Sequence, residues 1–220
     1  MKSRTIIFLL FVMIPALLPA QQYFIYVTLS GLRDAPIYLS RYEKSERVRI
    51  DSAVLTGGSC YFVLEPFDPA GIYSVSFDRE SGTPAPGIEF IWNMEDLYVT
   101  ADAGNIAVSA SFGGSEENRV LEIFRAFDNL YEQKMGSLYA VVDRYPEEDT
   151  YYRHSAEHFL ELQQQRDALI EKLCERYDTS FAAKIIASYR SPIIDPGLNP
   201  DQRLEFLKDH FFDRAQVSQP

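Results

Sequence analysis

The chain has 220 residues, of which 46% are hydrophobic and 14% aromatic, enough apolar material for one large domain or two small ones. Its formal net charge is −11. A surface of that sign repels phosphate backbones and anionic lipid, so binding to nucleic acid or to a membrane surface is disfavoured. A protein or peptide partner remains compatible with it.

The first 20 residues have the order of a secretory signal peptide. Lys2 and Arg4 precede an apolar run over 6–18, and Ala20 offers a small residue for cleavage. We therefore expect an extracytoplasmic, periplasmic protein without stable membrane insertion after cleavage, because the run is short for a permanent span. An uncleaved N-terminal anchor is the alternative. Without 1–20, 19 basic and 32 acidic residues remain, a net charge of −13.

Residues 21–112 are predicted to form a β domain. Runs rich in β-branched and aromatic residues, separated by turn residues, occur at 23–30, 36–43, 47–55, 60–65, 71–78, 88–92, 97–101 and 106–111. Gly57 and Gly58 separate the third run from the fourth and predict a hairpin there. Short strands at this spacing favour an antiparallel sandwich or an open barrel.

Residues 113–220 are predicted to form an all-α domain, which makes the fold class α+β. Ser115 is a candidate helix N-cap, and Glu116 and Glu117 suit the positive end of the helix dipole. From apolar periodicity and breaking residues, helices are predicted from Ser115 to Tyr145, from about Thr150 to Tyr177, over 180–189, and from Asn199-Pro200 onward.

The two cysteines, Cys60 and Cys174, are far apart in the sequence. The chain contains no C-x-x-C, so it cannot by itself carry out dithiol–disulfide exchange of the thioredoxin type. An exported protein could join these cysteines in a disulfide. The favoured interpretation is two separate buried thiols, since cysteine packs as a small hydrophobic residue.

His154, Glu157 and His158 have the H-x-x-E-H spacing of a zinc-peptidase signature. The two histidines lie about 40° apart on a helix, given about 100° per residue, and could share a metal ion. However, the apolar stripe of this helix centres near Phe159 and Leu169, which turns Glu157 to the solvent face. We therefore favour a solvated helix face over a metal-dependent hydrolase, and we assign no catalytic, cofactor-binding or metal-binding residue.

His210 stands between Asp209 and Asp213, but the sequence places no nucleophile beside it. We expect a structural role for this histidine, with the last helix docking through Phe211 and Phe212.

Several stretches in series resemble an uncharacterised N-terminal domain of exported Bacteroidetes proteins. The matching motifs are Ile50-Asp51-Ser52, Gly57-Gly58 and Tyr61-Phe62, within residues 25–78. SFGGSEENRVLEIF resembles the entry to the helical segment that follows this domain. SFAAKIIASYRSPIIDP and LEFLKDHFFD are similar to a second, helical module.

In that family the two modules usually precede a thioredoxin-like domain related to periplasmic thiol–disulfide oxidoreductases and peroxiredoxins. This chain has no matching cysteine pair, so the resemblance carries over no catalytic residue. It implies structural roles instead. Asp51 and Ser52 satisfy neighbouring backbone groups, and Gly57 and Gly58 supply positive φ.

These observations lead to two expectations for function. The first is a non-enzymatic, exported binding or accessory module for a protein or peptide partner. The alternative is the N-terminal portion of a thioredoxin-like oxidoreductase, whose catalytic domain would follow Pro220.

Overall fold

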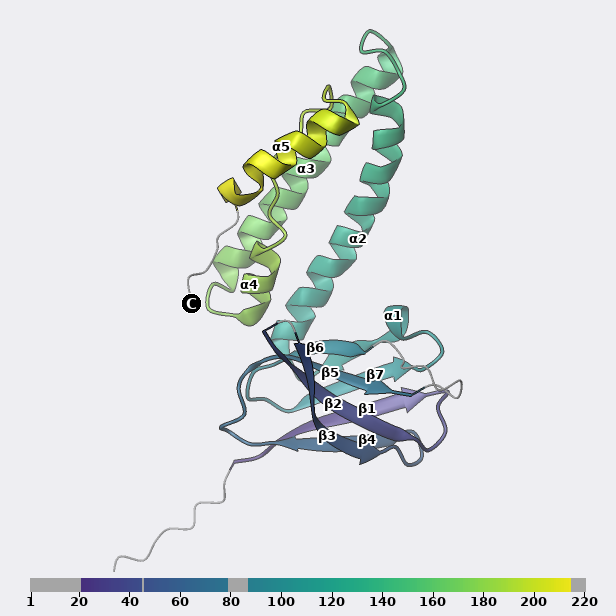
Figure 1. The fold of residues 1–220 in the computed structure, drawn as a ribbon, viewed down its shortest axis with the longest axis vertical. Coiled ribbons are helices and arrows are strands. Elements are labelled where there is room, and N and C mark those ends of the chain that lie inside the picture. Colours follow the sequence, from purple (N-terminus) through teal and green to yellow (C-terminus); the bar gives the residue numbers. More distant parts are fainter. Residues whose placement is uncertain (1–20, 45, 79–86, 215–220) are drawn as a thin grey trace, which may run out of the picture.

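The computed structural model describes residues 21–44, 46–78 and 87–214 (Figure 1). The predicted signal peptide at 1–20 lies outside these ranges. Within them, a β-rich N-terminal part is followed by helices, so the predicted α+β class is confirmed. Figure 1 shows the long helices extending from one end of the two sheets.

The described residues of the β part form eight strands and one short helix. The strands are β1 (Tyr23–Ser30), β2 (Pro36–Glu43), β3 (Glu46–Val54), β4 (Ser59–Leu64), β5 (Gly71–Phe77), β6 (Ile88–Trp92), β7 (Leu97–Asp102) and β8 (Ser111–Gly113). They form two four-stranded sheets in the orders β4-β1-β7-β8 and β3-β2-β5-β6. All neighbours are antiparallel except β1 and β7, which pair in parallel.

The alternation of the strands explains the core between the two sheets. Ile25, Val27 and Leu29 face inward from β1 and are almost fully buried, whereas Tyr26 and Thr28 between them are exposed. Inward residues of both sheets join a single hydrophobic cluster. The result is a sandwich rather than an open barrel.

The structure contains the predicted glycine turn, but the predicted hairpin between the strands on either side of it is wrong. Gly57 and Gly58 have φ of +60° and +84°, which suits a tight two-residue turn closed by the Thr56–Ser59 bridge. Beyond this bridge, β3 pairs with β2 and β4 pairs with β1. The buried Leu55 still donates its N–H to the carbonyl of Ala35, so the chain changes sheets at the turn itself.

The predicted strand at 106–111 is also wrong in part, because it is divided between α1 (Ile106–Ser109) and the short β8. The Ser109 hydroxyl accepts a hydrogen bond from the Asp102 N–H at 2.8 Å and donates one to the Asn105 carbonyl at 2.7 Å. These local bonds favour a helical turn over a strand. Ile106 is buried, whereas Val108 is 82% exposed.

The C-terminal part contains the predicted helices. They are α2 (Glu116–Val142), α3 (Thr150–Arg176), α4 (Phe181–Ala187) and α5 (Pro200–Arg214). Among the described residues, none of the helices has the length and apolar content needed to cross a membrane.

Two predicted N-caps have the expected geometry. The Ser115 hydroxyl accepts a hydrogen bond from the Asn118 N–H at the start of α2. Before α5, Asn199 and Gln202 each accept the other's backbone N–H at 3.0 Å, and Pro200 takes the first helical position.

The last helix docks differently from the prediction. Phe206 and Leu207 pack on the cluster between α2 and α3, and the buried Arg203 forms an ion pair with Asp143. Phe211 is 44% exposed, so the buried contacts of the helix come mainly from these other residues rather than from Phe211.

The Phe212 side chain lies outside the described part of the chain. His210 has a local role, with its Nδ1 2.9 Å from the Phe206 carbonyl oxygen and its ring stacked on Phe206 at 4.3 Å. A carbonyl only accepts, so Nδ1 carries the proton in this bond.

The first turn of α2 joins the helices to the sandwich. The buried Asn118 amide accepts the Ile91 N–H at 2.8 Å and donates to the Ile91 carbonyl at 2.7 Å. The Glu117 carboxylate accepts hydrogen bonds from the Asn93 side chain and from the N–H groups of Phe181 and Ala182 at the start of α4. The edge strand β6, α2 and α4 are therefore bonded together.

Candidate functional site

The H-x-x-E-H residues lie on the solvent-exposed side of α3. The His154 and His158 side chains are 76% and 48% exposed. His154 Nδ1 lies 3.8 Å from Glu157 Oε2, whereas His158 Nδ1 faces Glu161 Oε2 at 3.5 Å. Each histidine thus has its own carboxylate, and the described residues contain no group of three or more potential ligands able to hold one metal ion.

The two cysteines are free and lie in different cores. Cys60 packs against the sandwich core, and Cys174 packs against the cluster of α2, α3 and α4. Burial raises the pKa of the Cys60 thiol to about 11 and also raises the pKa of Cys174. At neutral pH both are thiols rather than thiolates, and a thiol is a poor nucleophile.

A groove opens where β3 and β4 form the edges of the two sheets. These edge strands lie on the same side of the sandwich and enclose about 510 Å³. The groove is lined by residues 51–54, 56 and 59–63. The two strands that border the groove are the ones that the sequence predicted to be hydrogen-bonded to each other.

The hydrogen-bond pattern shows which groups of β4 face this groove. Leu29 of β1 donates its N–H to the Gly58 carbonyl at 2.9 Å, so Gly58 and, by alternation, Cys60 and Phe62 are bonded to β1. Tyr61 and Val63 consequently direct their N–H and C=O groups to the edge of the sheet, where no strand of the described chain is paired with β4.

The edge of β3 is partly blocked. Leu55 and, by alternation, Ala53 are bonded toward β2, so Ser52 and Val54 face the edge. The Ser52 N–H is bonded to Oδ1 of Asp51 at 2.7 Å, and Asp51 thus satisfies a neighbouring backbone group, as predicted. A strand added to this side would find more unsatisfied donors and acceptors on β4 than on β3.

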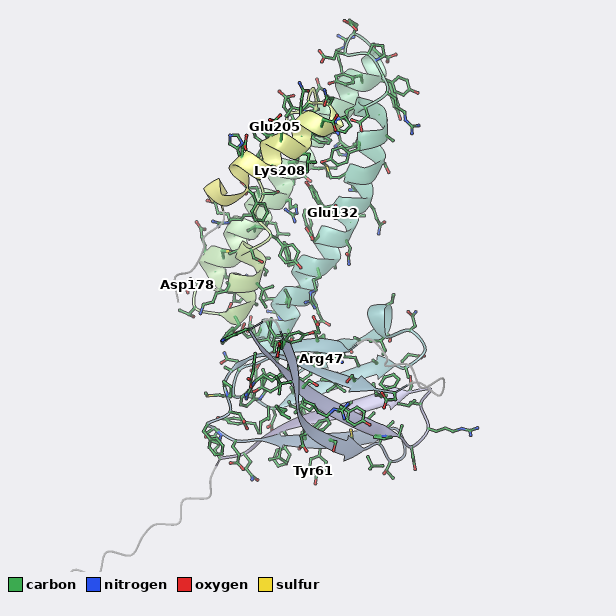
Figure 2. The ribbon with its side chains drawn as sticks, in the orientation of Figure 1. Arg47, Tyr61, Glu132, Asp178, Glu205 and Lys208 are labelled. Atoms are coloured by element: carbon green, nitrogen blue, oxygen red, sulfur yellow. The ribbon has the colours of Figure 1, made fainter. Side chains whose placement is uncertain are left out.

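An aromatic row adjoins the groove on the outer face of the first sheet. Tyr26 lies opposite Tyr61 of β4 and Tyr98 of β7. Its ring stacks on Tyr98 at 4.9 Å and on Phe24 at 5.8 Å, and Phe24 contacts Tyr61 at 6.0 Å. Tyr61 ends the row and is 58% exposed. Figure 2 places it at the end of the sandwich away from the helices.

The other side of the sandwich has a cleft of about 670 Å³ beneath α2. Apolar residues of β6, α1 and β8 face Glu122, Arg125 and Asn129 of α2 across it. Burial raises the pKa of Glu122, and the charge of Arg125 opposes this effect. At Ile91 the edge of β6 is not open, because Asn118 occupies both backbone groups of this residue.

Sequence reasoning missed the aromatic row and the role of Asn118. The row had a signal, because Phe24, Tyr26, Tyr61 and Tyr98 all occupy the outward positions of alternating strands. Their proximity depends on strand order, which local patterns do not specify. Asn118 had a weaker signal, a polar residue next to the apolar face of a helix.

Comparisons of the sequence with protein-family models and with curated proteins gave no match. The candidate site therefore rests on the geometry of this chain, and the family resemblance stays a prediction.

Proposed function

We propose that the chain is an exported, non-catalytic binding module that takes up an extended protein or peptide segment along β4. One observation carries the proposal: the unpaired edge of β4, with the outward backbone groups of Tyr61 and Val63, borders an open groove. An extended segment can add to such an edge as a further strand.

Each part of the groove has a function in this binding mode. Main-chain hydrogen bonds to Tyr61 and Val63 supply affinity that is independent of sequence, and side-chain contacts supply selectivity. Alternate residues of the segment enter the gap between the sheets or lie on the outer face beside Tyr61. A cross-strand contact with Tyr61 contributes roughly 0.2–1 kcal/mol.

The location of the protein follows from the predicted signal peptide, and we propose the periplasm. Within the same proposal, the resemblance to modules that precede thioredoxin-like domains suggests that the groove holds a client of such a domain. Peptide mapping of the protein from its own host tests this second possibility. Peptides that continue beyond Pro220 into a cysteine-containing segment would support it, whereas an end at Pro220 would favour an independent module.

Substitution at Val63 tests strand addition directly. Val63→Pro removes the outward N–H and keeps the hydrogen bonds of β4 to β1, since proline is tolerated on an edge strand. Val63→Thr is the matched control, because it keeps the N–H and the β-branched shape. Binders for the purified protein would be selected from a displayed peptide library and measured against both variants.

We expect Val63→Pro to weaken the selected peptides about tenfold or more, because a peptide carbonyl loses its donor on binding. Val63→Thr should stay close to the wild type. Hydrogen exchange should show bound peptide protecting the amides of Tyr61 and Val63. Peptides that protect other surfaces and bind Val63→Pro as well as the wild type would contradict the proposal.

A further inference from the structure

We infer that the segment bound by this groove is basic, with a Lys or Arg that faces Asp51 and an aromatic residue beside Tyr61. This inference rests on the proposed function and specifies the partner of the same site. It follows from the charge of the groove, the direction of its side chains and the order of the aromatic row.

Asp51 is the charged side chain of the groove. The other described residues that line it are apolar or neutral polar ones. Oδ1 of Asp51 is bonded to the Ser52 N–H, and no hydrogen bond to its Oδ2 exists among the described residues. The carboxylate can therefore accept a charge-assisted hydrogen bond from an incoming cation without losing its contact with β3.

The strand register directs Asp51 toward the gap between the sheets. Asp51 and Ala53 lie opposite Leu39 and Ile37 of β2, whose side chains are buried in the sandwich core. Cross-strand partners point to the same face of a sheet, so Asp51 and Ala53 share this inward direction. A segment paired with β4 thus meets Asp51 across the groove with its inward-facing residues.

The same alternation assigns the other positions of the segment. Residues that point outward extend the aromatic row beyond Tyr61, where an aromatic or β-branched side chain packs best. The remaining inward positions lie over Cys60 and Ala53, which are partly buried and favour a small apolar residue. The inferred pattern alternates aromatic residues with a basic residue and small apolar ones.

The charge of the whole protein supports the same partner. Outside the predicted signal peptide, 19 basic residues stand against 32 acidic ones. A field of that sign increases the association rate of cationic segments and decreases that of anionic ones. Asp51 adds a local interaction that this general attraction cannot replace.

The test uses two synthetic peptides with blocked ends, Thr-Val-Tyr-Lys-Tyr-Val-Thr and its counterpart with Glu in place of Lys. Both read the same in either direction, so strand orientation does not need to be known. Their affinities for the purified protein are measured at about 0.15 M salt, where charges farther away than about 8 Å are largely screened. We expect the Lys peptide to bind about two- to fivefold more tightly, the scale of an ion pair at a surface.

Two substitutions test whether Asp51 causes the tighter binding of the Lys peptide. Asp51→Asn keeps the acceptor for the Ser52 N–H and removes the charge, so the Lys-to-Glu affinity ratio should approach one. Glu157→Gln makes the same charge change on the exposed face of α3 and should leave the ratio unchanged. An unchanged ratio in Asp51→Asn would overturn the inference.

The outcomes separate this inference from the proposed function. If both peptides bound the wild type equally and neither bound Val63→Pro, strand addition would be supported. The inference that the bound segment is basic would be refuted. If neither peptide binds and the library also gives no binder sensitive to Val63→Pro, both proposals fail. If the Lys peptide bound Val63→Pro as tightly as the wild type, its binding would depend on charge and not on strand addition.

Discussion

The edge strands β6 and β4, on opposite sides of the sandwich, differ in how their outward backbone groups are satisfied. On the helical side, the Asn118 amide takes the place of a neighbouring strand and satisfies both backbone groups of Ile91. On the other side, no strand of the described chain pairs with the outer edge of β4, and Tyr61 is exposed beside it. An unpaired edge is a risk for aggregation, which proteins usually reduce by covering it.

The difference shows that the open side is not simply unprotected. Asp51 caps the Ser52 N–H on β3 and places a charge at the rim, two devices that oppose uncontrolled strand pairing. The outward backbone groups of Tyr61 and Val63 on β4 stay accessible, whereas on β3 the Ser52 N–H is covered and the groups of Val54 still face the edge. This selective protection is what we expect of a site that binds one kind of segment.

The largest loss of stability is expected from removing the Asn118 amide, which covers the edge of β6 at Ile91. Asn118→Ala removes the partner of both Ile91 backbone groups at a buried position, and each unsatisfied group costs about 1–3 kcal/mol. We expect the free energy of unfolding to fall by about 2–4 kcal/mol in urea denaturation. Glu116→Ala, an exposed change in the same helical turn, serves as the control and should have a much smaller effect.

This prediction also tests how the two parts are joined. If Asn118→Ala were as stable as Glu116→Ala, the hydrogen bonds to β6 would contribute nothing and the closed edge would not depend on them. Separate unfolding transitions for the sheets and the helices in the variant would show that this contact couples them.

A smaller effect is expected from uncapping β3. Asp51→Ala leaves the Ser52 N–H without its acceptor at an exposed edge, and we expect a loss of stability of about 1 kcal/mol or less. The variant should show more concentration-dependent self-association in sedimentation experiments, because a second strand edge is then open. Asp51→Asn retains the acceptor for the Ser52 N–H but removes the charge, so its self-association should lie between those of the wild type and Asp51→Ala. If Asp51→Ala associated no more than the wild type, Asp51 would have no protective role.

The contrast between the two sides could be predicted from the sequence only in part. The alternation of YFIYVTLS and the cap at Ser115 correctly predicted strand β1 and the start of α2, because these patterns depend on near neighbours. The pairing of β1 with β7, 72 residues apart at Ile25 and Leu97, depends on contacts that no local pattern contains.

The errors in the prediction have the same origin. Gly57-Gly58 correctly indicated a tight turn, but the buried Leu55 keeps β3 with β2, and the expected hairpin is divided between two sheets. That division creates the groove. The candidate site could not be predicted because it lies between two strands that appeared to be paired.

The smallest effect concerns the Cys60 thiol, which lines the open groove and contacts no charged group that lowers its pKa. Burial raises this pKa to about 11, so the neutral thiol is favoured in the folded protein. Between the pKa of an exposed thiol and about 11, the folded state binds more protons than the unfolded state, and stability should decrease as the pH rises through this window. Below it, this contribution is constant. Alkylation by iodoacetamide should accelerate correspondingly as the pH approaches 11.

Alkylation also distinguishes the two parts of the molecule. A peptide that adds to β4 covers the groove and should slow alkylation of Cys60, whereas Cys174, in the helical cluster, should react at the same rate with and without peptide. Mass spectrometry of the two tryptic fragments measures both rates in one sample. If peptide slowed both cysteines equally, the effect would be a general stabilisation of the fold. Protection of Cys60 alone requires the ligand to lie in the groove between β3 and β4.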